Sequence, residues 1–246
     1  MSVHRGLSPE TDAVFRSAGP SLGASLIARL GAGTVDWRRM LRIAEDEVAT
    51  AGLWRALKRE APTLVPTEVA EYLAKNTTMS DFRMQHLSGR LQGSVRALAA
   101  RGVRVLFMKG AAVGAMSDST FCSRPMNDID ILVHAADVTA ASDALRAAGW
   151  TFSTSPAIAD LLAGHHHLPP FLDPQLPGIR LELHLSSFPP EHPFAIGEED
   201  FWRDAVAATA PFAGASLPSA EHLRFHTRVH FAWAPSRSFR AWRPIP

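Results

Sequence analysis

The pattern of apolar and polar positions changes near residue 100, and this change predicts two kinds of structure. Before it, apolar residues recur with the 3.6-residue period of an amphipathic helix, most clearly over residues 36–60, "DWRRMLRIAEDEVATAGLWRALKRE". After a stretch that contains two prolines, a second helix is expected from about residue 66 to a C-cap at Gly102, with a break near Asn76. The pattern therefore predicts a helical N-terminal region over residues 1–100.

Beyond residue 100 the chain consists of short β-rich runs separated by helical segments. In "IRLELHLSS", residues 179–187, leucines alternate with polar residues, as in a strand with one buried face. Residues 135–150 are typical of an amphipathic helix. The other predicted strands are residues 103–110, residues 128–134 and a strand that begins at residue 151. This mixture predicts an α+β fold, with a small mixed β-sheet core and helices on one of its faces.

The C-terminal part of the chain shows weaker patterns. Residues 188–220 are rich in proline, alanine and glycine and predict a loop with one short helix around "EEDFWRDAVAAT". A further helix is expected over residues 219–233, followed by an arginine-rich tail. We therefore expect the core over residues 101–205 and a C-terminal helical segment over residues 206–246. This segment is either a natural tail or truncated relative to related chains.

The composition is that of an ordinary globular protein, with 46% hydrophobic and 20% charged residues in a chain of 246. A net charge of +1 gives no argument for binding to nucleic acid or to a membrane surface. The single cysteine excludes an internal disulfide, and neither a signal peptide nor a membrane-spanning run is evident. These features predict a cytoplasmic protein without a membrane partner, for which nucleic acid is not the expected partner.

Two carboxylates interrupt a run that is otherwise typical of a buried strand, "RPMNDIDILVH". Alternate residues of a strand share a face, so Asp128 and Asp130 point the same way, with Cα atoms about 6 to 7 Å apart. Burying a carboxylate is costly unless it is paired or coordinates an ion. The pair is therefore a candidate site for Mg²⁺ or Mn²⁺, because hard oxygen ligands favour these ions over Zn²⁺. A solvated strand end is the alternative.

A third carboxylate on a neighbouring strand would complete a site for two metal ions. Glu182 is the candidate, because it lies in the middle of the polar face of "RLELHLSS". The alternative is a surface glutamate on an edge strand. His184 shares the polar face with Glu182 and is expected to support the site or the fold rather than to bind the metal.

The turn "MKGAA", residues 108–112, directly follows a predicted strand. Gly110 would let the backbone approach a phosphate closely, and Lys109 and Arg124 would add positive charge beside it. Simple ion pairing of these two cations with the aspartates is the alternative. The "HHH" of residues 165–167 is expected to be a solvated loop or strand, since adjacent residues of a strand point to opposite faces.

These motifs, in this order, resemble the DNA-polymerase-β-like nucleotidyltransferase superfamily. The stretch "LFMKGAAVGAMSDSTFCSRPMNDIDILV" and the later "LELHLSS" look like a family of uncharacterised bacterial nucleotidyltransferases within it. That family carries a Lys-Gly turn, an arginine shortly before Asp-Ile-Asp, and a later strand with an acid and a histidine. The sequence departs from the usual Gly-Gly or Gly-Ser turn of the superfamily, because Ala111 follows Gly110.

The resemblance implies a metal-dependent enzyme that transfers a nucleoside monophosphate from a nucleoside triphosphate, ATP first among them, to an acceptor hydroxyl. It implies Asp128, Asp130 and Glu182 as the catalytic ligands of Mg²⁺ or Mn²⁺. It also implies Lys109, Gly110, Ala111 and Arg124 beside the nucleotide, with pyrophosphate as the leaving group. The alternative is a catalytically inactive module that binds a nucleotide or a protein, and the Ala111 turn favours it. The acceptor is open.

Overall fold

The structure, a computed structural model, describes residues 8–16, 21–116, 125–152, 165–189, 192 and 197–233. The chain divides into two compact units. The first is formed mainly by residues 1–82 and the second mainly by residues 83–234. The division of the chain into three domains stays a prediction.

The first unit is helical, and its helices bury one apolar cluster. The elements are α1 (Pro9–Arg16), α2 (Ala24–Gly31), α3 (Trp37–Asp46), α4 (Thr50–Glu60), a 3₁₀ turn (Pro62–Leu64) and the N-terminal part of α5 (Thr67–Ala99). Asp36 caps α3, since its side chain accepts a hydrogen bond from Arg39 N at 3.0 Å. The cluster has Leu22, Met40, Leu53, Leu57 and Leu73 among its fully buried members.

The single helix predicted over residues 36–60 is two helices. The chain ends α3 after Asp46, and Val48 takes a left-handed backbone conformation with a φ of 55°. Ala49 N then donates to the backbone oxygen of Ala44, five residues earlier, at 2.7 Å, a hydrogen bond that is typical of a helix C-terminus. The apolar period continues across this reversal, so the sequence pattern does not reveal it.

Helix α5 is continuous, and the break predicted near Asn76 is absent. The side chain of Asn76 donates to the oxygen of Tyr72, and that of Thr77 donates to the oxygen of Leu73, so both bond within the helix. The predicted stop is confirmed: Gly102 has a φ of 72° just after the last turn. Among the described residues no helix, α5 included, has the length and apolarity needed to cross a bilayer.

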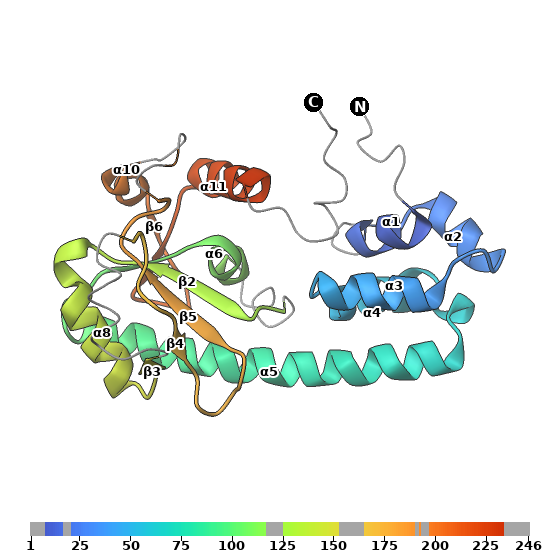
Figure 1. Ribbon diagram of the computed structural model, residues 1–246, viewed down its shortest axis with the longest axis horizontal. Coiled ribbons are helices and arrows are strands. Elements are labelled where there is room, and N and C mark those ends of the chain that lie inside the picture. The colour runs from blue at the N-terminus through green and yellow to red at the C-terminus, as the bar shows by residue number, and fades with distance from the viewer. Residues whose placement is uncertain are drawn as a thin grey trace. The chain divides into compact units, whose positions relative to one another are not determined.

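The second unit is built on a mixed sheet of seven strands, which confirms the predicted α+β class (Figure 1). The order is β3-β4-β5-β2-β1-β7-β6, with β2 parallel to β5 and antiparallel to β1. The strands are β1 (Val105–Phe107), β2 (Asp128–Leu132), β3 (Thr151–Phe152), β4 (Phe171–Leu172), β5 (Arg180–His184), β6 (Val206–Ala207) and β7 (Ala215–Leu217). The helices are the C-terminal part of α5, α6 (Lys109–Ala115), a 3₁₀ turn (Ala135–Asp137), α8 (Val138–Ala147), α10 (Glu198–Arg203) and α11 (Ala220–Trp233).

The sequence pattern misses the shortest strands. Residues 188–220 are predicted as a loop with one helix, but they also contain β6 and β7, and β7 pairs in parallel with β1. Strands of two or three residues are too short to show an alternation, and their pairing with distant partners is what forms them.

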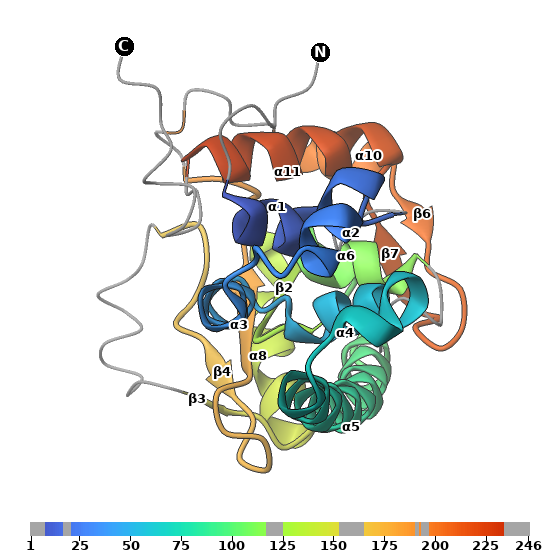
Figure 2. The ribbon, with the colours of Figure 1, turned by 90° about the vertical axis from the view of Figure 1, so that its right-hand side faces the viewer.

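The strand β2 separates two environments. Ile129, Ile131 and Val133 are buried in the main core, which the C-terminal part of α5 and α8 cover. These two helices lie next to each other in both views (Figures 1 and 2). On the opposite face of β2, Leu132 packs in a smaller cluster with Phe201 and other residues of α10 and β1. Asp128 and Asp130 share that opposite face.

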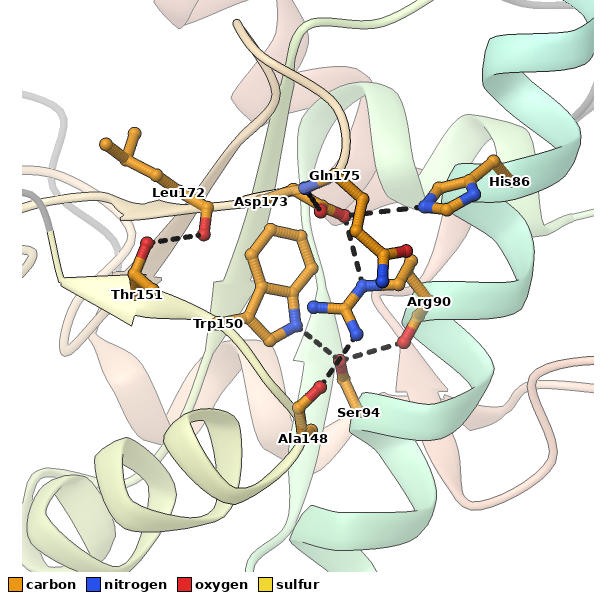
Figure 3. A network of polar contacts seen from close by, with 9 residues as sticks. All are labelled: His86, Arg90, Ser94, Ala148, Trp150, Thr151, Leu172, Asp173 and Gln175. Carbon is orange, nitrogen blue, oxygen red and sulfur yellow. Dashed lines mark hydrogen bonds and ion pairs between the residues drawn. The ribbon is translucent and has the colours of Figure 1, made fainter.

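A polar network joins α5 to the β3 and β4 side of the sheet (Figure 3). Arg90 of α5 donates through Nε to Asp173 Oδ2 at 3.0 Å and through Nη1 to the oxygen of Ala148 at 2.8 Å. Trp150 lies beside the guanidinium and donates to Ser94 Oγ at 2.8 Å. The carboxylate of Asp173 is fully buried, so this ion pair fixes the segment that leads into β5.

Replacing Asp173 by alanine should lower the free energy of unfolding by about 3 kcal/mol, because Arg90 is left partly buried without its carboxylate. Urea unfolding followed by circular dichroism measures the change. Asp143→Ala is the matched control, since Asp143 pairs with Arg146 at the surface and should contribute less than about 0.5 kcal/mol. Equal effects of the two substitutions would contradict the role of Asp173.

Candidate functional site

Asp130 is a buried carboxylate in the middle of the sheet, with 2% of its surface exposed. Its Oδ1 accepts a hydrogen bond from Lys109 Nζ at 2.6 Å and another from His184 Nε2 at 2.8 Å. Two charge-assisted hydrogen bonds offset much of the cost of removing a carboxylate from water. The negative charge of Asp130, which is unexpected in a buried strand, is therefore paired by Lys109 and His184.

Lys109 reaches Asp130 because of the turn that joins β1 to α6. Met108 is extended and donates from its N–H to the backbone oxygen of Asp130 at 2.9 Å, which continues the pairing of β1 with β2. Lys109 then takes a left-handed conformation, with a φ of 44°, and begins α6. A residue with a Cβ adopts this conformation at a cost of about 1 kcal/mol or more. The strained residue of the turn is thus the one whose ammonium pairs with Asp130.

Two further side chains come from β5, which runs parallel to β2. The register sets Glu182 beside Asp130 and His184 beside Leu132, so both β5 side chains lie on the face of Asp130. His184 Nε2 is 3.6 Å from Glu182 Oε2, in addition to its contact with Asp130. Ligand atoms of Asp130, Glu182 and His184 all lie within 4.8 Å of one another, which makes them a candidate metal-binding group.

Within this group, the neighbouring side chains favour the ionised forms of Asp130, Glu182 and His184. Burial opposes ionisation of Asp130, but the hydrogen bond from His184 and the charge of Lys109 outweigh it and hold the pKa of Asp130 well below its usual range. The interaction with His184 lowers the pKa of Glu182. Burial also opposes protonation of His184, but its contacts with Asp130 and Glu182 outweigh burial and raise the pKa of His184. Two carboxylates therefore face the Lys109 ammonium and an imidazole whose protonated form they favour.

The other predicted site residues lie outside this group. Asp128 opens β2 on the face of Asp130 and is exposed, and among the described residues it is not part of the converging group. Gly110 and Ala111 lie in the first turn of α6, where Ala111 is fully buried. Arg124 lies outside the described residues. The predicted residues that the structure brings together are Lys109, Asp130, Glu182 and His184.

Two histidines that were expected in solvent lie against His184. His167 forms an antiparallel bridge with His184, and the ring centroids of His166 and His167 are 5.5 and 5.2 Å from that of His184. Burial, together with the neighbouring histidines and Lys109, lowers the pKa of His166 to about 4. These two histidines are partly buried rather than fully solvated, because pairing with the edge of β5 that faces away from β2 brings them against His184. No local pattern in the sequence signals that pairing.

The sheet and the acidic group define the protein as an α+β chain with a candidate metal-binding cluster on paired parallel strands. The sequence profile of a family described as uncharacterised nucleotidyltransferase matches residues 33–237, which is most of the chain. The chain therefore belongs to this nucleotidyltransferase family. Neither the curated proteins nor the solved structures include a significant match.

Asp130→Asn should lower the pKa of the His184 imidazole, because it removes the negative acceptor that outweighs the effect of burial. In the wild-type protein His184 should stay protonated to a pH above about 6.5, the ordinary value for histidine. NMR titration of the histidine ring resonances measures both. Asp204→Asn, at an exposed aspartate, is the control and should leave the titration unchanged. An unaltered His184 titration in Asp130→Asn would contradict the assigned pairing.

Proposed function

We propose that the chain transfers a nucleoside monophosphate from a nucleoside triphosphate, ATP first among them, to an acceptor hydroxyl and releases pyrophosphate. The observation that carries the proposal is the convergence of Asp130, Glu182 and His184 within 4.8 Å in a member of a nucleotidyltransferase family. Phosphoryl transfer depends mainly on positioning and on charge placed around the phosphate oxygens. Buried, mutually oriented acids and cations are suited to that task.

The acids fit a divalent cation. Carboxylate oxygens are the ligands that Mg²⁺ and Mn²⁺ prefer, and both hydrogen bonds to Asp130 fall on Oδ1 rather than Oδ2. We assign Asp130 and Glu182 as ligands, with Asp128 as a third carboxylate from the same face of β2. A bound Mg²⁺ or Mn²⁺ supplies a Lewis acid for the phosphate oxygens.

The remaining residues orient the acids and meet the nucleotide. His184 fixes the rotamer of Asp130 through the 2.8 Å hydrogen bond and so acts as a positioning residue. The Lys109 ammonium has three donors, of which one goes to Asp130, and the others are available to phosphate oxygens. Gly110, Ala111 and Arg124 complete the proposed nucleotide side of the site. The superfamily that we propose for this family is the DNA-polymerase-β-like one.

An inactive nucleotide-binding module is the second candidate. The observation in its favour is that Lys109 and His184 already compensate the charge of Asp130, so the cluster can be stable without catalysis. The two candidates differ in turnover, because both would bind a nucleotide and only the enzyme would release pyrophosphate.

Asp130→Asn and Glu182→Gln should each lower the rate of nucleotidyl transfer by about 100-fold or more, because each removes a ligand charge while keeping the shape of the side chain. The assay measures pyrophosphate release from each of the four nucleoside triphosphates with Mg²⁺ or Mn²⁺, and transfer of an α-phosphate label to the protein or to pooled hydroxyl acceptors.

Asp204→Asn is again the matched control and should keep the wild-type rate, since Asp204 is exposed and outside the site. Full activity of Asp130→Asn would rule out the assigned site. Nucleotide binding by the wild-type protein with no turnover in any of these assays would favour the inactive module.

A further inference from the structure

Oδ1 of Asp130 is held from two sides by protein groups. Lys109 Nζ lies 2.6 Å away on one side and His184 Nε2 2.8 Å away on the other. A two-metal phosphoryl-transfer site would need room for two cations beside the carboxylates and the phosphate. Here the Lys109 ammonium already occupies one side of Asp130 Oδ1.

From this geometry we infer that Lys109 takes the place of one of the two metal ions, so that the site binds a single divalent cation. The inference rests on the proposed nucleotidyltransferase function and specifies its cation requirement. A lysine ammonium has three donors and can bond Asp130 and a phosphate oxygen at the same time, which is the bridging role of a metal ion. It cannot act as a Lewis acid toward a bound oxygen, so the remaining ion keeps that role.

The backbone sets the point from which the Lys109 side chain starts, beside Asp130. The residue lies at the strained turn between β1 and α6, directly after the hydrogen bond from Met108 N to the oxygen of Asp130. Its side chain is 22% exposed and that of Asp130 is 3% exposed. Since so little water reaches the carboxylate, withdrawing the ammonium would leave Asp130 short of a compensating charge. The burial of Asp130 therefore favours its contact with Lys109.

Charge repulsion favours the same conclusion. A second divalent cation bound at Asp130 Oδ1 would lie close to the Lys109 ammonium, whose Nζ is 2.6 Å from that oxygen. Repulsion between like charges grows with the charge of each, so a divalent ion beside Lys109 is disfavoured more strongly than a monovalent group.

The test is a count of Mn²⁺ ions bound to the full chain, alone and with a non-hydrolysable ATP analogue, from the electron paramagnetic resonance signal of free Mn²⁺. The wild-type protein should bind about one Mn²⁺ and show no coupling between metal ions about 4 Å apart. Lys109→Met, of similar length but uncharged, should bind about two and show the coupling. Lys109→Arg keeps the charge and should stay at about one.

Lys58→Met is the matched control, because Lys58 is exposed on α4 of the first unit, and it should leave the count unchanged. Two coupled ions in the wild-type protein would overturn the inference but leave the proposed function standing. A count of one in Lys109→Met would also overturn it, since the lysine would then not be what excludes the second ion. Failure of the wild-type protein to bind any Mn²⁺ would contradict the metal-dependent function itself and the inference with it.

Discussion

The pairing of a buried carboxylate with an ammonium and an imidazole is the interaction on which the site depends. Asp130 lies on a central strand where an unpaired charge would be strongly destabilising. Lys109 arrives from the end of β1 and His184 from β5, so three adjacent strands must be in register before the charge is compensated. The same contacts that make the sheet tolerate Asp130 also give its carboxylate a defined direction.

A second buried ion pair helps to position β5, the strand that carries Glu182 and His184. Arg90 connects α5 to Asp173, a short way before β5, and to the chain that leaves α8 (Figure 3). The position of β5 sets where Glu182 and His184 lie relative to Asp130. A network remote from the acids in sequence therefore contributes to their geometry, as expected when a functional group is assembled from separate strands.

Local chemistry in the sequence is sufficient to predict much of this site. The alternation of β2 and β5 fixes which residues share a face, so the sequence alone groups Asp128 with Asp130 and Glu182 with His184. Where the local pattern carries no signal, the predictions were wrong. The helix expected over residues 36–60 is interrupted by the reversal at Val48, and His166 and His167 are drawn to β5 by strand pairing.

The amino-acid sequence by itself predicts the class of fold, the acidic strand and the likeness to nucleotidyltransferases. The spacing of apolar residues and the order of the motifs are properties of the chain alone. Only the tertiary structure brings Lys109 and His184 together on one oxygen of Asp130. It also leaves Asp128 outside the converging group. These distances are set by strand register and by the backbone turn at Lys109. Both depend on pairing between segments more than twenty residues apart, which no local pattern records.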